Sequence, residues 1–184
     1  MEVLLEVKIC EIYNSIQGES IWQGLPCLFI RVSGCNLRCV WCDSKYTWNE
    51  DESTEMTVDE LYNAVKLFNA RLVEITGGEP LLYSREVVRL TERLVKEGKQ
   101  VLIETNGSLS IPSIHNFRNR IHFIMDIKCP SSGMSDKNRL GNLRKLTRYD
   151  NLKFVIANRE DYEYAKKILK SNHIGCEVIF MPVW

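Results

Sequence analysis

The sequence has no excess of charge of either sign, because 24 lysine and arginine residues balance 24 aspartate and glutamate residues. This balance argues against direct binding of nucleic acid, which normally requires a basic excess. No apolar run approaches the roughly 20 residues that span a bilayer. The opening stretch MEVLLEVKICEIY lacks the basic start and the long apolar run of a secretory signal. We therefore expect a cytoplasmic protein that binds neither nucleic acid nor membrane.

Histidine is scarce, with three residues, whereas cysteine is frequent, with seven. Cytoplasmic thiols stay reduced, so an odd number of cysteines does not indicate a disulfide framework. Three of them lie in the stretch GCNLRCVWCDSKYTW with the spacing C-x3-C-x2-C, which is typical of metal or redox chemistry: Cys35, Cys39 and Cys42. The other four have no ligand spacing and are expected to be small buried hydrophobic residues: Cys10, Cys27, Cys129 and Cys176.

Repeats and linkers are absent, so the 184 residues are expected to form one domain, 1–184, with a hydrophobic core. Hydrophobic periodicity predicts helices opening at Thr57 and Ser84, each capped by that residue, and a helix over residues 160–170. Strands are predicted over residues 28–32, 72–76, 101–105, 121–127, 152–157 and 177–181. This alternation predicts an α/β fold with a mostly parallel sheet, arranged as an open or partial barrel of about six strands.

Unusual local sequences follow the predicted strands. They are the cysteine loop, TGGEP, ETNG, DIKCP and ANRE. Because the carboxyl ends of parallel strands meet at one edge of a sheet, and active-site residues of such folds collect there, these segments predict a single site.

Three clustered thiolates are compatible with more than one kind of centre. A 4Fe-4S cluster usually takes four thiolates, so three would leave one iron open for a substrate or cofactor. A zinc ion would need a fourth ligand, such as Asp43 or a remote cysteine. Cys39 and Cys42 alone form a C-x-x-C pair, which is also a thiol–disulfide motif. Spacing alone leaves these alternatives open.

The stretch CNLRCVWC, together with TGGEP, resembles the radical SAM superfamily. The resemblance covers nearly the whole chain and implies a partial (β/α)6-type radical SAM barrel. It also implies a 4Fe-4S cluster on the three cysteines, whose open iron chelates S-adenosylmethionine. An electron donor such as flavodoxin or ferredoxin would reduce the cluster, and cleavage of S-adenosylmethionine would give a 5′-deoxyadenosyl radical. In such enzymes the protein positions the reactants and the cofactors carry the chemistry.

The segments NSIQGES, ETNGS and DIKCPSSGM narrow the resemblance to the 7-carboxy-7-deazaguanine synthase family. The family implies a lyase of queuosine and 7-deazapurine biosynthesis. Its substrate is the pterin 6-carboxy-5,6,7,8-tetrahydropterin, whose ring contracts with loss of ammonia. S-adenosylmethionine is regenerated, Mg2+ assists, and the enzyme is a homodimer.

The resemblance also implies roles for individual residues. Arg31 can pair with the substrate carboxylate through both arms of its guanidinium group. The Ser44 hydroxyl is the implied Mg2+ ligand, since Mg2+ prefers oxygen. The implied substrate-binding residues are Ile16, Gln17, Gly18, Arg31 and Thr76. The implied contacts to S-adenosylmethionine are Trp41, Cys42, Asp43, Gly78, Glu104, Asp126, Ile127, Lys128, Ala157, Asn158, Arg159 and Glu160.

Two other functions compete with this interpretation, and the chain differs from the family pattern at its C-terminal end. A glycyl-radical-enzyme activase shares a similar cysteine loop but acts on a protein. A zinc-stabilised binding module would explain three cysteines but not the glycines at the strand ends. The sequence ends at VIFMPVW, where family members continue with a helix, a strand and a terminal residue near the substrate. We therefore expect a short member or an incomplete chain, which leaves the C-terminal substrate contacts open.

Overall fold

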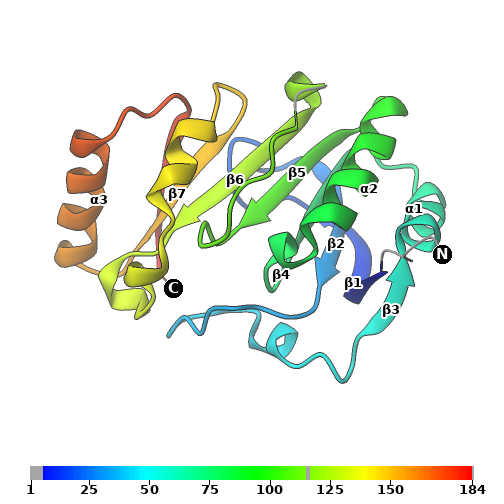
Figure 1. The fold of residues 1–184 in the computed structure, drawn as a ribbon, viewed down its shortest axis with the longest axis horizontal. Helices are drawn as coiled ribbons and strands as arrows, with labels where there is room; N and C mark the ends of the chain where they lie inside the picture. Colours follow the sequence, from blue (N-terminus) through cyan, green and yellow to red (C-terminus); the bar gives the residue numbers. More distant parts are fainter. Residues whose placement is uncertain (1–5, 115–116, 184) are drawn as a thin grey trace.

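The computed structural model describes residues 6–114 and 117–183, in which eight strands form one sheet (Figure 1). The strands lie across the sheet in the order β3-β1-β2-β4-β5-β6-β7-β8. Their bounds are Glu6–Ile16 for β1, Pro26–Val32 for β2, Thr54–Thr57 for β3, Leu72–Gly77 for β4, Gln100–Thr105 for β5, Ile121–Ile127 for β6, Asn151–Ile156 for β7 and Glu177–Pro182 for β8.

The parallel part of the sheet consists of β2 and β4 to β8, each parallel to its neighbours in this set. These are the predicted strands, so the expected α/β fold with a mostly parallel sheet is confirmed. β1 and β3 pair antiparallel at one edge, and the sequence does not predict them. The last three positions of β1 are exposed, so the alternation of buried and exposed residues that marks a strand is short there.

Three α-helices lie within the described residues: α1 (Val58–Lys66), α2 (Ser84–Lys96) and α3 (Arg159–Ser171). The predicted capping box of α1 is present, with Thr57 as its N-cap. The expectation that Ser84 caps α2 is wrong. Ser84 has helical dihedral angles because the 3-10 turn Pro80–Tyr83 leads directly into the helix, so Tyr83 is the N-cap.

The sheet has a different kind of core on each face. The large core includes residues of all three helices and alternate positions of the central strands, such as Val73, Ile75 and Ile103. A small core on the other face contains Cys27, Phe29, Leu72, Leu102 and Ile124. Side chains alternate along a strand, so the positions two residues further along share this second face. Towards the carboxyl ends of the strands these positions are polar, and they include Arg31, Glu74, Glu104 and Asp126.

The isolated cysteines only partly match the expectation of buried hydrophobic residues. Cys27 and Cys129 are buried, and burial is the main cause that raises the pKa of each thiol to about 12. Cys10 and Cys176 are half-buried. Cys176 packs against the large core.

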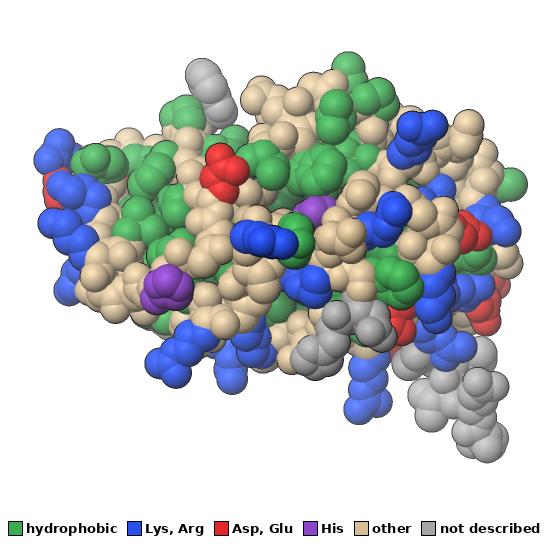
Figure 2. Space-filling model, turned by 90° about the horizontal axis from the view of Figure 1, so that it is seen from above, with side chains coloured by type: hydrophobic (Ala, Val, Ile, Leu, Met, Phe, Trp, Pro, Cys, Tyr) green, Lys and Arg blue, Asp and Glu red, His purple; other side chains and the backbone are tan. Residues whose placement is uncertain are grey.

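In the part of the chain that the structure describes, no helix has the length and apolar character needed to span a membrane. On the face seen in Figure 2, lysine and arginine side chains are scattered among hydrophobic and other atoms instead of forming one continuous basic surface.

Candidate active site

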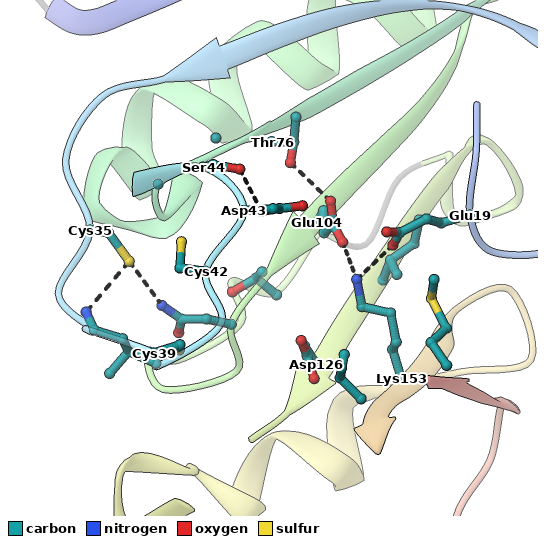
Figure 3. Close-up of a pocket in the computed structure, with 18 of the residues that line it drawn as sticks. Glu19, Cys35, Cys39, Cys42, Asp43, Ser44, Thr76, Glu104, Asp126 and Lys153 are labelled. Carbon is teal, nitrogen blue, oxygen red and sulfur yellow. Dashed lines mark hydrogen bonds and ion pairs between the residues drawn. The ribbon is translucent and has the colours of Figure 1, made fainter. Parts of the chain in front are cut away.

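A cavity of about 460 Å³ lies at the carboxyl ends of the parallel strands (Figure 3). Four of the five strand-end segments meet at this cavity, as expected for a single site. The fifth, ANRE, does not line it. The predicted site residues that line it are Gln17, Gly18, Arg31, Cys35, Cys39, Trp41, Cys42, Asp43, Ser44, Thr76, Gly78, Glu104, Asp126 and Lys128. Figure 3 shows the three cysteines on one side of the cavity, with Glu104, Lys153 and Glu19 on the other.

The cysteine loop follows β2 and presents three half-buried thiols to the cavity. The Leu37 N–H lies 3.4 Å from the Cys35 sulfur, and the Asn106 side-chain amide lies 3.8 Å from it. Burial raises the pKa of the Cys35 thiol, and these two donors oppose the rise. Burial also raises the pKa of Cys39, against the charge of Lys128. Metal ligation requires thiolates, so binding of a metal centre here would release protons.

The glycine pair that ends β4 allows the strand to press against the cysteine loop. Gly77 has a φ of +130°, and a Cβ atom there would lie 2.3 Å from the Val32 carbonyl oxygen. A Cβ atom on Gly78 would lie 1.9 Å from the Gly34 carbonyl oxygen. Any side chain would therefore force the two segments apart. Beside the thiols, the end of the strand therefore presents main-chain atoms without side chains to the cavity. A ligand can approach such atoms closely.

Glu79, the next residue, connects these segments although the sequence assigns it no role. Its fully buried carboxylate accepts hydrogen bonds from the Leu81 and Asn106 N–H groups at 2.9 and 2.7 Å and from the Thr105 hydroxyl at 2.8 Å. Burial raises its pKa, and these hydrogen bonds oppose the rise. Its own N–H donates to the Gly34 carbonyl at 2.8 Å. Glu79 therefore fixes TGGEP and ETNG relative to the cysteine loop.

Arg31 and Ser44 lie together on the wall of the cavity. The Arg31 guanidinium donates to Glu11 at 2.8 Å and to the Tyr13 hydroxyl at 3.1 Å, and one of its nitrogens lies 3.5 Å from the Ser44 hydroxyl. Ser44 donates to the Asp43 carboxylate at 2.7 Å. A cation and a pair of hard oxygens are thus adjacent, which is a chemically suitable setting for a carboxylate and a magnesium ion.

A partly buried charge network, with Lys153 as its buried member, forms the opposite wall (Figure 3). Glu104 accepts a hydrogen bond from the Thr76 hydroxyl at 2.9 Å and forms an ion pair with Lys153. Lys153 also donates to Glu19 at 2.8 Å. Burial alone would raise the pKa of Glu104, but the charge and hydrogen bond of Lys153 outweigh it and lower the pKa to about 2. Burial alone would lower the pKa of Lys153, but the charges of Glu104, Asp126 and Glu19 outweigh it and raise this pKa well above the usual range.

Asp126 offers a free acceptor to the cavity. One of its carboxylate oxygens accepts from Lys128 at 2.7 Å, and its side chain is nearly buried. The other oxygen is buried and has no hydrogen-bond partner among the described residues. Buried polar atoms are normally paired, so a lone acceptor that lines a cavity indicates a ligand group that would complete it.

Some predicted site residues lie away from the cavity. Ile16 is 64% exposed at the end of β1, and Ile127 is buried in the large core. The ANRE loop is occupied in starting α3: the Asn158 side chain caps the helix, and Arg159 pairs with Glu163. None of its four residues lines the cavity, and their assignment to S-adenosylmethionine stays a prediction: Ala157, Asn158, Arg159 and Glu160.

The sequence missed several residues that line the cavity. Glu74 and Lys153 lie inside the apolar strands LVEITG and NLKFVI, where a charged residue within a buried run is the signal that could have identified them. Glu19 belongs to NSIQGES, but the sequence alone predicts no role for it. The cavity also reaches the last described residues, Met181, Pro182 and Val183.

The donor set suits a cluster better than a single ion. Within residues 6–114 and 117–183, no three side chains of His, Cys, Asp or Glu lie close enough to hold one metal ion. A mononuclear zinc site draws its sulfurs to about 2.3 Å from one point, whereas a cubane holds each on a different iron. Three thiols spread along one loop, beside a bare glycine backbone and the free Asp126 oxygen, fit a cluster and a small polar cofactor.

Comparisons with known proteins agree on one family. The model of the radical SAM superfamily matches residues 29–155. The 7-carboxy-7-deazaguanine synthase of Koribacter versatilis is 46% identical over 182 residues, covering 97% of this chain and 78% of the relative. That of Thermoplasma acidophilum is 40% identical over 176 residues, covering 96% and 82%. The crystal structure of QueE from Escherichia coli superposes with a TM-score of 0.78 at 23% identity, covering 97% of this chain and 84% of that one, and supports the fold.

Proposed function

Because the chain belongs to the radical SAM superfamily and, within it, to the 7-carboxy-7-deazaguanine synthases, we propose that its cavity converts 6-carboxy-5,6,7,8-tetrahydropterin into 7-carboxy-7-deazaguanine. The ring contracts and ammonia leaves. The observation that carries this proposal is that three loop thiols, a strand end formed by glycines and the guanidinium group of Arg31 line one cavity. Neither a zinc module nor a glycyl-radical-enzyme activase accounts for the family membership.

Cofactors are held on the cysteine side of the cavity. Membership of the superfamily implies a 4Fe-4S cluster on Cys35, Cys39 and Cys42 and a bound S-adenosylmethionine. When bound, the pair supplies a 5′-deoxyadenosyl radical. The chain contributes position and exclusion of water: the backbone at Gly78 lies against the loop, and the free Asp126 oxygen is available to a polar group of the cofactor.

The substrate is bound on the Arg31 side in this proposal. Arg31 would pair with the substrate carboxylate, and the adjacent Ser44 hydroxyl would be the protein ligand of Mg2+. Thr76, Gln17 and Gly18 contact the ring from the wall of the cavity, whereas Ile16, predicted together with them, does not line it. The ion pair of Glu104 and Lys153 orders the far wall. We also propose that an electron donor such as flavodoxin or ferredoxin reduces the protein, and that the protein is a homodimer in the cytoplasm.

The test is turnover by protein reconstituted anaerobically with iron and sulfide. With S-adenosylmethionine, Mg2+, a reductant and the carboxylated tetrahydropterin, we expect a deazaguanine product without net consumption of S-adenosylmethionine. Omission of Mg2+ should slow the reaction. Accumulation of 5′-deoxyadenosine without a deazaguanine would leave the superfamily chemistry intact but show that the substrate is wrong. A colourless protein holding stoichiometric zinc would refute the cluster.

A further inference from the structure

Glu74 is a buried carboxyl group at the cavity for which the proposed reaction has no use. It lies on β4 two residues before Thr76, on the same face of the strand, and the residue is 3% exposed. Among the described residues no lysine, arginine or histidine lies within ion-pair distance of it. A buried carboxylate without a cation is costly, so a neutral, hydrogen-bonded form is favoured.

One oxygen of Glu74 is fixed as an acceptor by Gln17. The Gln17 side-chain oxygen accepts from the Glu19 backbone N–H at 2.8 Å, which determines how the amide is turned. The Gln17 NH2 group therefore points at the Glu74 Oε2 atom and donates to it. A proton on Glu74 must then reside on Oε1.

The partner of that proton is Glu104. Both oxygens of Glu104 accept hydrogen bonds, from Thr76 at 2.9 Å and from Lys153, so Glu104 is the charged member of the pair. Glu74 lies beside this pair, because it precedes Thr76 by two residues on the same face of β4 and Thr76 donates to Glu104. Burial and the Glu104 charge raise the pKa of Glu74 well above its usual range, against the charge of Lys153. Two contacting carboxyl groups in a buried site share one proton rather than ionise together.

Lys153 also donates to the Glu19 carboxylate at 2.8 Å. Hydrogen bonds therefore run in sequence from Glu74 through Gln17, Glu19 and Lys153 to Glu104. Across the remaining step, from Glu74 to Glu104, only a proton on one of the two carboxyl groups can act as the donor. We propose that the proton on Glu74 closes these five residues into a ring, which holds residues 17–19 over the cavity and makes Glu74 a positioning residue for the substrate. The substrate assignment rests on the proposed function, whereas the ring itself does not.

Loss of the proton should open the ring. The charged and titratable groups that face Glu74 are Glu104 on β5, Lys153 on β7, Glu19 after β1 and the Cys27 thiol on β2. The pKa of Cys27 is raised to about 12, so it stays neutral. As the pH rises through the raised pKa of Glu74, Glu74 and Glu104 would both be negatively charged. Both would then share Lys153 with Glu19. Their repulsion would release residues 17–19 and weaken substrate binding.

The first arm of the test needs neither cofactor nor substrate. The purified chain should show the infrared carbonyl band of a protonated carboxylic acid at neutral pH. The band should lose intensity in Glu74→Gln and keep it in the exposed matched variant Glu55→Gln on β3. The Glu19 backbone amide should exchange hydrogen faster in Glu74→Ala, but not in Glu74→Gln, whose amide can still donate to Glu104 and accept from Gln17. An unchanged band in Glu74→Gln, or equal exchange in both variants, would overturn the ring.

The second arm uses the reconstituted enzyme. KM of the wild type should rise at alkaline pH with little change in kcat, and Glu74→Gln should lose this rise because it cannot ionise. Glu74→Ala should raise KM by about tenfold or more at all pH values, the loss expected for a hydrogen bond to a charged group. A pH-dependent rise that survives in Glu74→Gln would refute the role of the proton. If the wild type forms no deazaguanine, the proposed function is wrong, and the infrared and exchange results alone decide the ring.

Discussion

Replacement of Lys153 by methionine tests whether the charge network stabilises the fold as the structure implies. The side chain of Lys153 is 7% exposed and pairs with both Glu104 and Glu19. Methionine keeps much of the volume and the flexibility of the stem but removes the cation. The substitution leaves two carboxylates facing a buried space without a counter-charge, which is the costly way to break a buried ion pair.

The magnitude can be worked from the Glu104 carboxyl group. Its pKa is about 2 against an ordinary value of 4.5, and a pKa about 2.5 lower in the folded state corresponds to roughly 3 kcal/mol of stability. Because the folded pKa is the lower one, this contribution is present above pH 4.5 and is lost as the pH falls through about 2. Truncation of one member of a buried pair costs about 3–5 kcal/mol. Because the Glu104 and Glu19 side chains are 26% and 38% exposed, we expect a loss near the lower end of that range at pH 7.

The pH dependence separates this explanation from simple loss of packing. Without Lys153, burial raises the pKa of Glu104, so the variant should take up a proton there at mildly acidic pH and recover part of its deficit. Anaerobic urea unfolding at pH 7 and pH 4 measures both free energies of unfolding. The matched control is Lys166→Met on α3, an exposed pair with Glu163 at 3.1 Å, which should cost less than about 0.5 kcal/mol. A Lys153 deficit equal to the control, or independent of pH, would refute the reasoning.

The other predictions concern the cofactor and substrate sides of the cavity. Cys39→Ala should abolish turnover and the brown colour of the reconstituted protein while leaving the circular dichroism spectrum unchanged, whereas Cys176→Ala should keep turnover. Gly78→Ala should destabilise the fold by more than about 2 kcal/mol, because its Cβ would meet a backbone oxygen at 1.9 Å; Gly141→Ala, where nothing lies within 4 Å, should not. Arg31→Lys should raise KM for the carboxylated substrate more than it lowers kcat, since lysine cannot pair bidentately; an unchanged KM would count against that contact.

The sequence predicts the parallel part of the fold well, because its strands are continuous apolar runs bounded by clear turn residues. LFIRV and IHFIMDI are buried along nearly their whole length, as expected for strands covered on both faces. The antiparallel edge gives a weaker signal. β3 has only four residues, and β1 becomes exposed at its end, so neither shows a sustained alternation. Pairing between them depends on contacts distant in sequence, which periodicity does not report.

The cofactor side of the site is also visible in the sequence, because its residues are adjacent in the chain. The cysteine spacing and TGGEP lie in two short loops. Trp41, Asp43 and Ser44 are predicted as site residues because they belong to the cysteine loop. The charge network has no such local pattern. Lys153 and Glu19 are 134 residues apart, and each is one charged residue in an ordinary segment. Only the order of the strands in the sheet brings them together.

The charged residues inside the strands also explain how the sheet tolerates a polar cavity. On the face away from the helices, an apolar layer that includes Leu102 and Ile124 supports a polar layer that includes Glu104 and Asp126, two residues further along the same strands. Each buried charge of the polar layer would be unfavourable alone, so the layer is stable only as a set of pairs. The same pairing keeps donors and acceptors fixed in direction before a substrate arrives, which reduces the reorganisation that binding requires. The unpaired Asp126 oxygen is the exception, and it lies where a ligand can supply the missing donor.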